Sequence, residues 1–152
     1  MLAVKPGGLY VDGTVGLGGH AAAVLEAGAP DARLVAFDRD AETMARAREA
    51  LAGYGDRVRF VHADVREIPA QLGAQRADGI LLDLGMSSPQ VDDPARGFSF
   101  RYDAPLDMRM DPGAGITAAE CVNEMEEEDL ADVIYRFGED RASRRIARAI
   151  VS

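Results

Sequence analysis

The stretch "VDGTVGLGGH" (residues 11–20) decides how the chain is read, because it places four glycines within seven positions. The apolar segment "GLYV" before it predicts a strand, and "AAAVLEAG" after it predicts a helix. A glycine-rich turn from a parallel strand into a helix lets backbone N–H groups approach a ligand, and the helix N-terminus adds partial positive charge. The stretch therefore predicts a ligand-binding turn in an α/β fold.

Strands and helices alternate around this turn through the first half of the chain. The sequence predicts strands over 8–12, 32–38, 57–64 and 78–85, with helices over 19–27, 41–51 and 66–72. Nearly continuous apolar strands separated by helices indicate a parallel sheet covered on both faces. In a doubly wound order "ILLDL" would be a bare apolar edge, which invites aggregation. We therefore expect further strands in sequence that this chain lacks.

The pattern changes at Gly85. Residues 85–115 lack clear periodicity, and a loop of that length in a compact domain usually carries function. Helical character returns over 117–137 and 140–151, and the second helix reaches Ser152 without a stop signal. We expect the chain to be a fragment of a longer protein.

The composition is that of a globular protein, with 152 residues of which 47% are hydrophobic and 28% charged. No apolar run is long enough to cross a membrane, and the N-terminal segment is too short for a secretory signal. Cys121 is the single cysteine, which excludes an internal disulfide. His20 and His62 lack the spacing of paired metal ligands, so no metal site is expected. These features favour a cytoplasmic protein without a membrane partner.

Acidic residues follow the four predicted strands: Asp12, Asp38, Asp64 and Asp83. One such residue is more often a helix cap, but four beside a glycine turn indicate a ligand crevice. Asp38 lies 22 residues after Gly16, where a carboxylate can accept both ribose hydroxyls of a nucleoside. Asp12 would repel a pyrophosphate, whereas it suits the positive charge on the methionine portion of S-adenosylmethionine. The string G-L-G-G-H-A nevertheless fits the dinucleotide fingerprint, so an NAD-dependent oxidoreductase remains the alternative.

Four segments resemble the bacterial ribosomal RNA small-subunit methyltransferase H family: "YVDGTVGLGGH", "AFDRD", "DGILLDLGMSSPQVDDPARGFSFRYDAPLDMRMD" and "FGEDRASRRIARAIVS". The resemblance extends over essentially the whole chain. It implies a class I S-adenosylmethionine-dependent methyltransferase with a Rossmann-like parallel sheet, truncated here, and the start of an inserted helical domain. The implied activity is methylation of N4 of a decoding-centre cytidine in 16S ribosomal RNA. The partner would be 16S ribosomal RNA or the small subunit. The resemblance leaves the oligomeric state open, and a homodimer is one option. An inactive fragment of the methyltransferase is a further alternative for this chain.

The resemblance also implies which residues contact the methyl donor: Gly18, Gly19, His20, Asp38, Val65, Asp83 and Gln90. Val65 stands where the family commonly has a phenylalanine beside the adenine, so it offers an apolar wall without a stacking face. Residues 1–112 would form the N-terminal part of the methyltransferase domain, and residues 113–152 would begin the helical insertion. The closing strands of the sheet would be absent.

The reaction itself indicates a role for Asp83. The exocyclic amine of cytosine is a poor nucleophile, because its lone pair is delocalised into the ring. Direct in-line transfer needs alignment of nitrogen, methyl carbon and sulfur, together with a group that accepts hydrogen bonds from the amine. Asp83, which opens "DLGMSS", is predicted to orient the amine and stabilise its developing charge. Methylation at C5 would need a cysteine nucleophile, and Cys121 lies in a predicted helix.

Two further patterns bear on RNA, although the net charge of −9 argues against a general nucleic-acid binder. In "RGFSFRYD" (96–103), aromatic residues alternate with arginines, and they either clamp an unpaired base or pin the loop to the core. Four arginines recur at helical spacing near the C-terminal end, where they form either a solvated face or a phosphate-binding face: Arg141, Arg144, Arg145 and Arg148. Residues 123–132 carry six acids and no base, which predicts a face that repels RNA.

Overall fold

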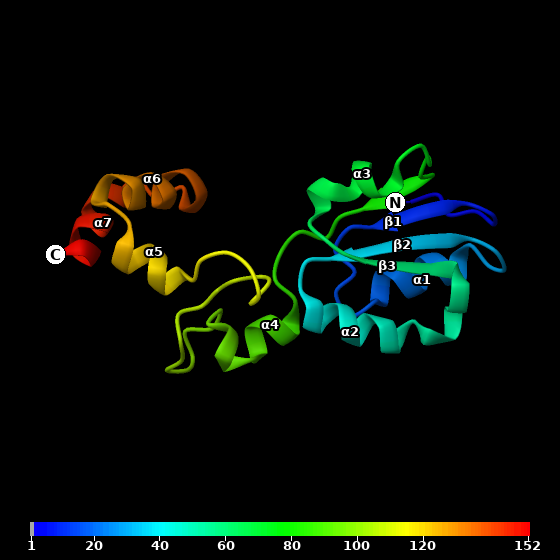
Figure 1. Ribbon diagram of the computed structural model, residues 1–152, viewed down its shortest axis with the longest axis horizontal. Helices are drawn as coiled ribbons and strands as arrows, with labels where there is room; N and C mark the ends of the chain where they lie inside the picture. The colour runs from blue at the N-terminus through cyan, green and yellow to red at the C-terminus, as the bar shows by residue number, and fades with distance from the viewer. Residues whose placement is uncertain (1) are drawn as a thin grey trace. The chain divides into compact units, whose positions relative to one another are not determined.

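The computed structural model describes residues 2–152, which form two compact units. The first unit ends at Ser87 and the second extends from Ser88 to Ser152. Figure 1 shows a sheet with flanking helices in the first unit and helices alone in the second. No helix among the described residues is both long and apolar enough to cross a lipid bilayer.

The first unit contains a four-stranded parallel sheet in the order β3-β2-β1-β4. Its strands are β1 (Leu9–Asp12), β2 (Arg33–Asp38), β3 (Val58–His62) and β4 (Gly79–Leu81). The two central strands are largely buried, as their continuous apolar sequences predict. The predicted parallel sheet is confirmed.

Helices cover both faces of this sheet (Figure 1). One face carries α1 (Gly19–Ala27), α2 (Ala41–Ala50) and the 3₁₀ segment η1 (Ala52–Arg57). The other carries η2 (Val65–Glu67) and α3 (Ile68–Leu72). A buried cluster fills each interface, because side chains alternate between the two faces along every strand. Leu25, Leu34 and Leu51 are almost inaccessible to solvent in the first cluster.

The strand β4 is shorter than the predicted 78–85 and lies at the edge of the sheet. Its last paired residue, Leu81, faces Asp12, where β1 also ends, so the chain has no neighbour to pair with beyond that point. The predicted bare edge is confirmed, since Ile80, Leu82 and Leu84 are 50%, 48% and 72% exposed.

The second unit is helical and differs in detail from the sequence prediction. Its elements are α4 (Ser88–Asp92), η3 (Pro94–Arg96), α5 (Ala118–Glu124), α6 (Glu127–Gly138) and α7 (Ser143–Val151). The predicted helix over 117–137 is two helices, because the backbone is extended at Met125 and Glu126. The segment 85–115 is not wholly irregular, since it contains α4 and η3.

The core of this unit joins its last three helices. Leu130 and Ala131 on α6 pack against Ala147 on α7, and Val122 on α5 lies against the same cluster. Thr117 and Glu120 form a capping box at the start of α5, which fixes where that helix begins. Helix α7 starts three residues later than the predicted 140, so Arg141 precedes it.

The segment "PLDMRMD" (105–111) has a structural role that spacing alone did not indicate. The guanidinium of Arg96 is 8% exposed and donates to the backbone carbonyls of Arg109 and Met110, at 3.0 and 2.9 Å. Met108 N–H donates to the carbonyl of Arg96 in return, at 3.0 Å. Arg96 is therefore a buried residue that holds the loop together.

Replacing Gly97 with alanine should destabilise the second unit by about 3 kcal/mol, because the cost of a positive φ and the cost of a steric clash add. Gly97 has a φ of +71°, and a Cβ there would lie 2.5 Å from the Pro105 carbonyl oxygen and 2.7 Å from the Asp107 nitrogen. Gly115 is the matched control, since its φ is +78° but its Cβ would meet open space. Urea unfolding should show a loss of only about 1 kcal/mol for Gly115→Ala. Equal losses in the two variants would contradict the steric argument.

Two arginine-bound aspartates make the fold sensitive to acid. Hydrogen bonds from Arg66 lower the pKa of Asp64 to about 2, and those from Arg109 lower the pKa of Asp107 to about 2. Both pKa values lie below the ordinary 3.8, so the ionised carboxylates stabilise the fold. This stabilisation is complete above about pH 4 and is lost as the pH falls towards 2. Urea midpoints measured from pH 5 to pH 2.5 should fall less steeply for Asp107→Asn than for the native chain. Identical pH profiles would contradict this assignment.

Candidate functional site

The glycine turn connects β1 to α1 and is tied to the strands on either side. Gly13 N–H donates to the Leu81 carbonyl of β4 at 2.9 Å, and Val15 N–H donates to the Phe37 carbonyl of β2 at 2.8 Å. At Gly18, the N-cap of α1, φ is +88° and a Cβ would lie 3.1 Å from Leu51. A side chain at this position would meet both strain and crowding, so the tight turn requires glycine.

The N-terminus of α1 presents free hydrogen-bond donors. No side chain caps this nine-residue helix, and within residues 2–152 the N–H groups of Gly19 and His20 have no acceptor. A Cβ built on Gly19 would meet no atom within 4 Å, so the space in front of it is open. Free amides at a helix start, with its partial positive charge, suit an anionic group such as a carboxylate.

Asp12 lies at the end of β1 and presents the opposite charge. Its side chain is 1% exposed; one oxygen accepts a hydrogen bond from Thr14 N–H at 3.1 Å, and the other has no hydrogen-bond partner in the described chain. Burial raises the pKa of Asp12, and the neighbouring carboxylates of Asp38 and Asp83 raise it further, whereas His20 opposes the shift. A buried carboxylate oxygen without a partner is costly, and a cationic ligand group would satisfy it.

Asp38, at the end of β2, holds the turn in place. Its Oδ2 accepts from Gly16 N–H at 3.0 Å and its Oδ1 accepts from Asp40 N–H at 2.9 Å. Burial raises the pKa of Asp38, and these backbone donors partly offset that shift. Each carboxylate oxygen has a second acceptor site, so Asp38 can still receive two hydroxyl groups from a ligand.

Asp83 lies beside His20, two residues after β4 ends. The Asp83 Oδ2 is 3.8 Å from His20 Nδ1, and both side chains are mostly exposed. Asp83 N–H donates to the Thr14 hydroxyl at 2.7 Å, which links the segment after β4 to the glycine turn. The fold therefore brings together two residues that are 63 positions apart in the sequence. Sequence reasoning missed Thr14, although its place inside the turn, two residues after Asp12, was a signal.

An apolar wall completes this crevice. A Cβ built on Gly13 would lie 2.3 Å from Leu82, 3.2 Å from Ile68 and 3.3 Å from Val65, so these three side chains surround the turn. The fold thus places Val65 beside the glycine turn. Leu82 was not among the predicted contacts.

The other polar positions lie on different elements. Asp64 caps η2 and accepts hydrogen bonds from Arg66, so it has the ordinary structural role of a helix cap. Gln90 lies on α4 in the second unit. His62 ends β3 and its Nε2 lies 3.0 Å from the Arg39 carbonyl oxygen. Cys121, on α5, is a half-buried free thiol.

The chain is similar to known proteins over its whole length. The chain matches the MraW methylase family over residues 1–152. It is 55% identical over 154 residues to ribosomal RNA small subunit methyltransferase H of Syntrophobacter fumaroxidans, covering 99% of this chain and 48% of that protein. The protein of the same name from Geotalea uraniireducens is 54% identical over 153 residues, with 99% and 49% covered. The chain thus spans about half the length of these curated relatives.

A solved structure is similar to about half of the chain. The crystal structure of PH0851 matches with a TM-score of 0.51 and 30% identity, over 55% of this chain and 19% of that one. The parallel sheet with helices on both faces agrees with the predicted methyltransferase fold, and so does the methylase family that the chain matches.

Proposed function

The chain belongs to the MraW methylase family, and on that premise we propose that the whole protein methylates the N4 amine of a decoding-centre cytidine in 16S ribosomal RNA. S-adenosylmethionine would supply the methyl group, carried on a sulfonium. The proposed substrate is 16S ribosomal RNA or the small ribosomal subunit, which implies a cytoplasmic enzyme. The names of the relatives support the substrate class.

One observation carries the proposal for the donor: the glycine turn joins groups of opposite electrostatic character at the end of β1 and the start of α1. The unsatisfied Asp12 oxygen suits a cation, and the free amides of Gly19 and His20 suit an anion. An amino-acid moiety, with its ammonium and carboxylate, carries both charges. A pyrophosphate carries only negative charge, so Asp12 would repel it. This pairing favours S-adenosylmethionine over NAD.

The other residues of the crevice fit the nucleoside part of the donor. Asp38 would accept the ribose hydroxyls while its backbone bonds keep the glycine turn in place. Val65 would provide an apolar wall for the adenine. Gly18 would let the turn approach the donor closely. Gln90, on α4, would also contact the donor.

Asp83 is the proposed catalytic residue. Its carboxylate is exposed at the mouth of the crevice, so an amine of the substrate can reach it. Accepting a hydrogen bond from that amine would orient the nitrogen lone pair and stabilise the positive charge that develops there. His20, 3.8 Å from this carboxylate, would help to hold its direction.

Exposed aromatic residues in the second unit support an RNA substrate. Phe100 is fully exposed and Tyr102 is 53% exposed. The alternative in which the phenylalanines pin the loop to the core is therefore wrong for Phe100. We propose that Phe100 stacks on an unpaired base, since every base offers a face for stacking.

The proposal also covers the domain organisation. Residues 1–112 would form the N-terminal part of the methyltransferase domain, with four strands and an active-site loop, and residues 113–152 would begin a helical insertion. The closing strands of the sheet would pair with the exposed edge of β4.

The test is methyl transfer by the full-length protein. Small subunits and naked 16S ribosomal RNA lacking the modification are incubated with S-adenosylmethionine labelled in its methyl group, digested to nucleosides and analysed by mass spectrometry. We expect label in N4-methylcytidine from at least one of the two substrates. Label in a C5-methylated or ribose-methylated nucleoside, or none in either substrate, would contradict the proposed reaction.

A further inference from the structure

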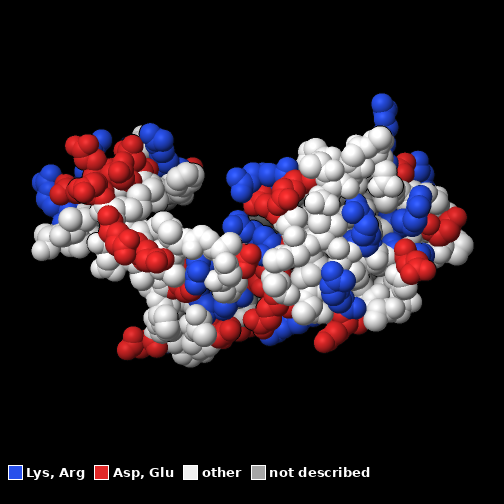
Figure 2. Space-filling view, viewed as in Figure 1, with Lys and Arg blue, Asp and Glu red and all other residues white. Residues whose placement is uncertain are grey.

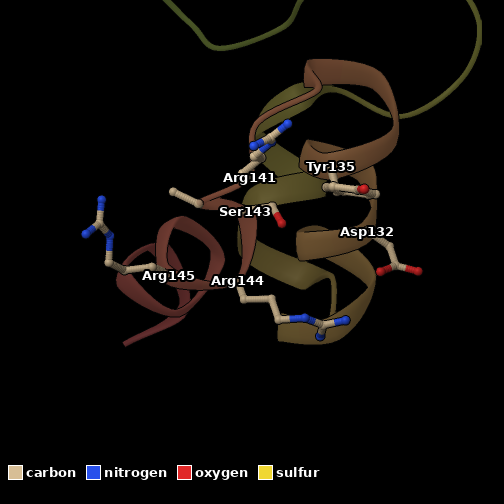
Figure 3. Close-up of a pocket in the computed structure, with 7 residues that line it drawn as sticks. Asp132, Tyr135, Arg141, Ser143, Arg144 and Arg145 are labelled. Carbon is tan, nitrogen blue, oxygen red and sulfur yellow. The ribbon is translucent and has the colours of Figure 1, made fainter.

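A pocket of about 650 Å³ lies between α6 and α7 in the second unit (Figure 3). Its lining residues are Asp132, Tyr135, Arg141, Ala142, Ser143, Arg144 and Arg145. Three arginines and one aspartate give this lining a net charge of +2, whereas the whole chain carries −9. We call it the α7 pocket. Its charge is opposite to that of the protein around it, which indicates an anionic ligand.

The hydroxyl group of Ser143 points into the α7 pocket. Ser143 is 5% exposed, and Figure 3 shows its hydroxyl directed towards the space between Tyr135 and Arg144. Among residues 2–152 no side-chain hydrogen bond of this hydroxyl is seen, and Ser143 has no further polar contact. A hydroxyl that lines a pocket and has no protein partner can donate to a ligand, and a phosphate oxygen would accept that hydrogen bond.

The start of α7 adds backbone donors at the same place. The helix has nine residues, and no side chain caps its N-terminus. The N–H groups of Arg144 and Arg145 donate to no acceptor in the described part of the chain. Free amides at the positive end of a helix suit an anion, and here they adjoin the Ser143 hydroxyl.

The arginines of the α7 pocket are available, unlike others in the same unit. Arg148 is bound to Glu127 at 3.2 Å, and Arg136 is bound to Asp132 at 3.2 Å, which partly neutralises the one acid of the lining. The three pocket arginines form no ion pair with any residue in 2–152. Figure 2 shows acidic side chains gathered on the visible face of this unit, with basic side chains towards its edges. The positive charge that would attract an anion is therefore local to the α7 pocket.

We propose that the α7 pocket binds a phosphate group of the RNA backbone. The Ser143 hydroxyl and the amides of Arg144 and Arg145 would donate to its oxygens, and the guanidinium groups of Arg141 and Arg144 would neutralise its charge. The pocket has room for a sugar beside the phosphate, and the half-exposed ring of Tyr135 offers that sugar an apolar wall. The proposal rests on the proposed function in that RNA is taken to be the substrate.

The test measures binding of a fluorescein-labelled single-stranded RNA oligonucleotide by anisotropy across a salt series, without S-adenosylmethionine. The double variant Arg141→Gln/Arg144→Gln should lose about 10-fold to 100-fold in affinity. The slope of log K, where K is the association constant, against log salt should be smaller in magnitude by about 1.4, because two phosphate contacts are lost. Ser143→Ala should lose about 3-fold to 10-fold. Arg148→Gln is the matched control on the same helix and should stay within about 2-fold. Circular dichroism verifies that each variant is folded.

The outcomes separate the two proposals. An unchanged salt slope in the double variant, or an equal loss in Arg148→Gln, would overturn the phosphate site. A second arm adds inorganic phosphate to ¹⁵N-labelled protein, and shifts of the Arg144 and Arg145 amides, competed by the oligonucleotide, would support it. Shifts that the oligonucleotide leaves unchanged would overturn it in favour of a site for free phosphate. None of these readouts depends on methyl transfer, so failure of the proposed function would appear only in the methylation assay.

Discussion

Replacing Asp12 with asparagine should weaken S-adenosylmethionine binding by about 100-fold while making the ligand-free protein more stable. The affinity falls because the cationic end of the donor loses a buried, charge-assisted partner worth about 3 kcal/mol. Stability rises because the substitution removes a buried carboxylate that has one unsatisfied oxygen. Isothermal calorimetry and thermal unfolding measure the two effects, and we expect a Tm increase of about 2–4 °C.

The pH dependence gives this prediction a second check. Burial raises the pKa of Asp12 above the ordinary 3.8, so the ionised side chain destabilises the fold above its folded-state pKa and the penalty fades as the pH falls through that value. The gain in Tm from Asp12→Asn should therefore be larger at pH 7 than at pH 3. Asp56→Asn, at an exposed position of η1, is the control and should change neither property. A variant that binds the donor normally would refute the role of Asp12.

Replacing Asp83 with asparagine should lower kcat for methyl transfer by about 100-fold to 1000-fold in the full-length protein. An amide is a weaker acceptor than a carboxylate and carries no charge to stabilise the reacting amine. The affinity for S-adenosylmethionine should change by less than about 10-fold, because Asp12, Asp38 and the α1 amides remain. The Tm should stay unchanged, since the Asp83 side chain is 71% exposed. Single-turnover kinetics separates the chemical step from binding, and native kcat in the variant would disprove the assignment.

Much of the first unit could be predicted from the sequence, because its signals are local. The bounds of α1 are those predicted, since the glycine turn marks its start and a second glycine its end. The sheet order follows from parallel strands joined by helices. Asp12, Asp38 and Asp83 could be placed at one sheet edge, because the carboxyl ends of parallel strands meet there.

The second unit was harder to predict, because its decisive contacts are not periodic. Arg96 looks like a surface residue in the sequence, and only the folded loop supplies the carbonyls that bury it. The break at Met125 lacks a proline or glycine signal. The arginine face could be predicted, but the ion pair from Arg148 to Glu127 depends on how α6 and α7 pack, so the sequence overstated the number of available arginines.

The central claim is that the sheet edge formed by β1, β2 and the segment after β4 holds a zwitterionic nucleoside. A crystal structure of the full-length protein with S-adenosylmethionine tests it most directly. We predict the donor's ammonium at Asp12, its carboxylate at the Gly19 and His20 amides, its ribose at Asp38 and its methyl group beside Asp83. A donor bound with its ribose away from Asp38 and its methyl group away from Asp83 would contradict the account.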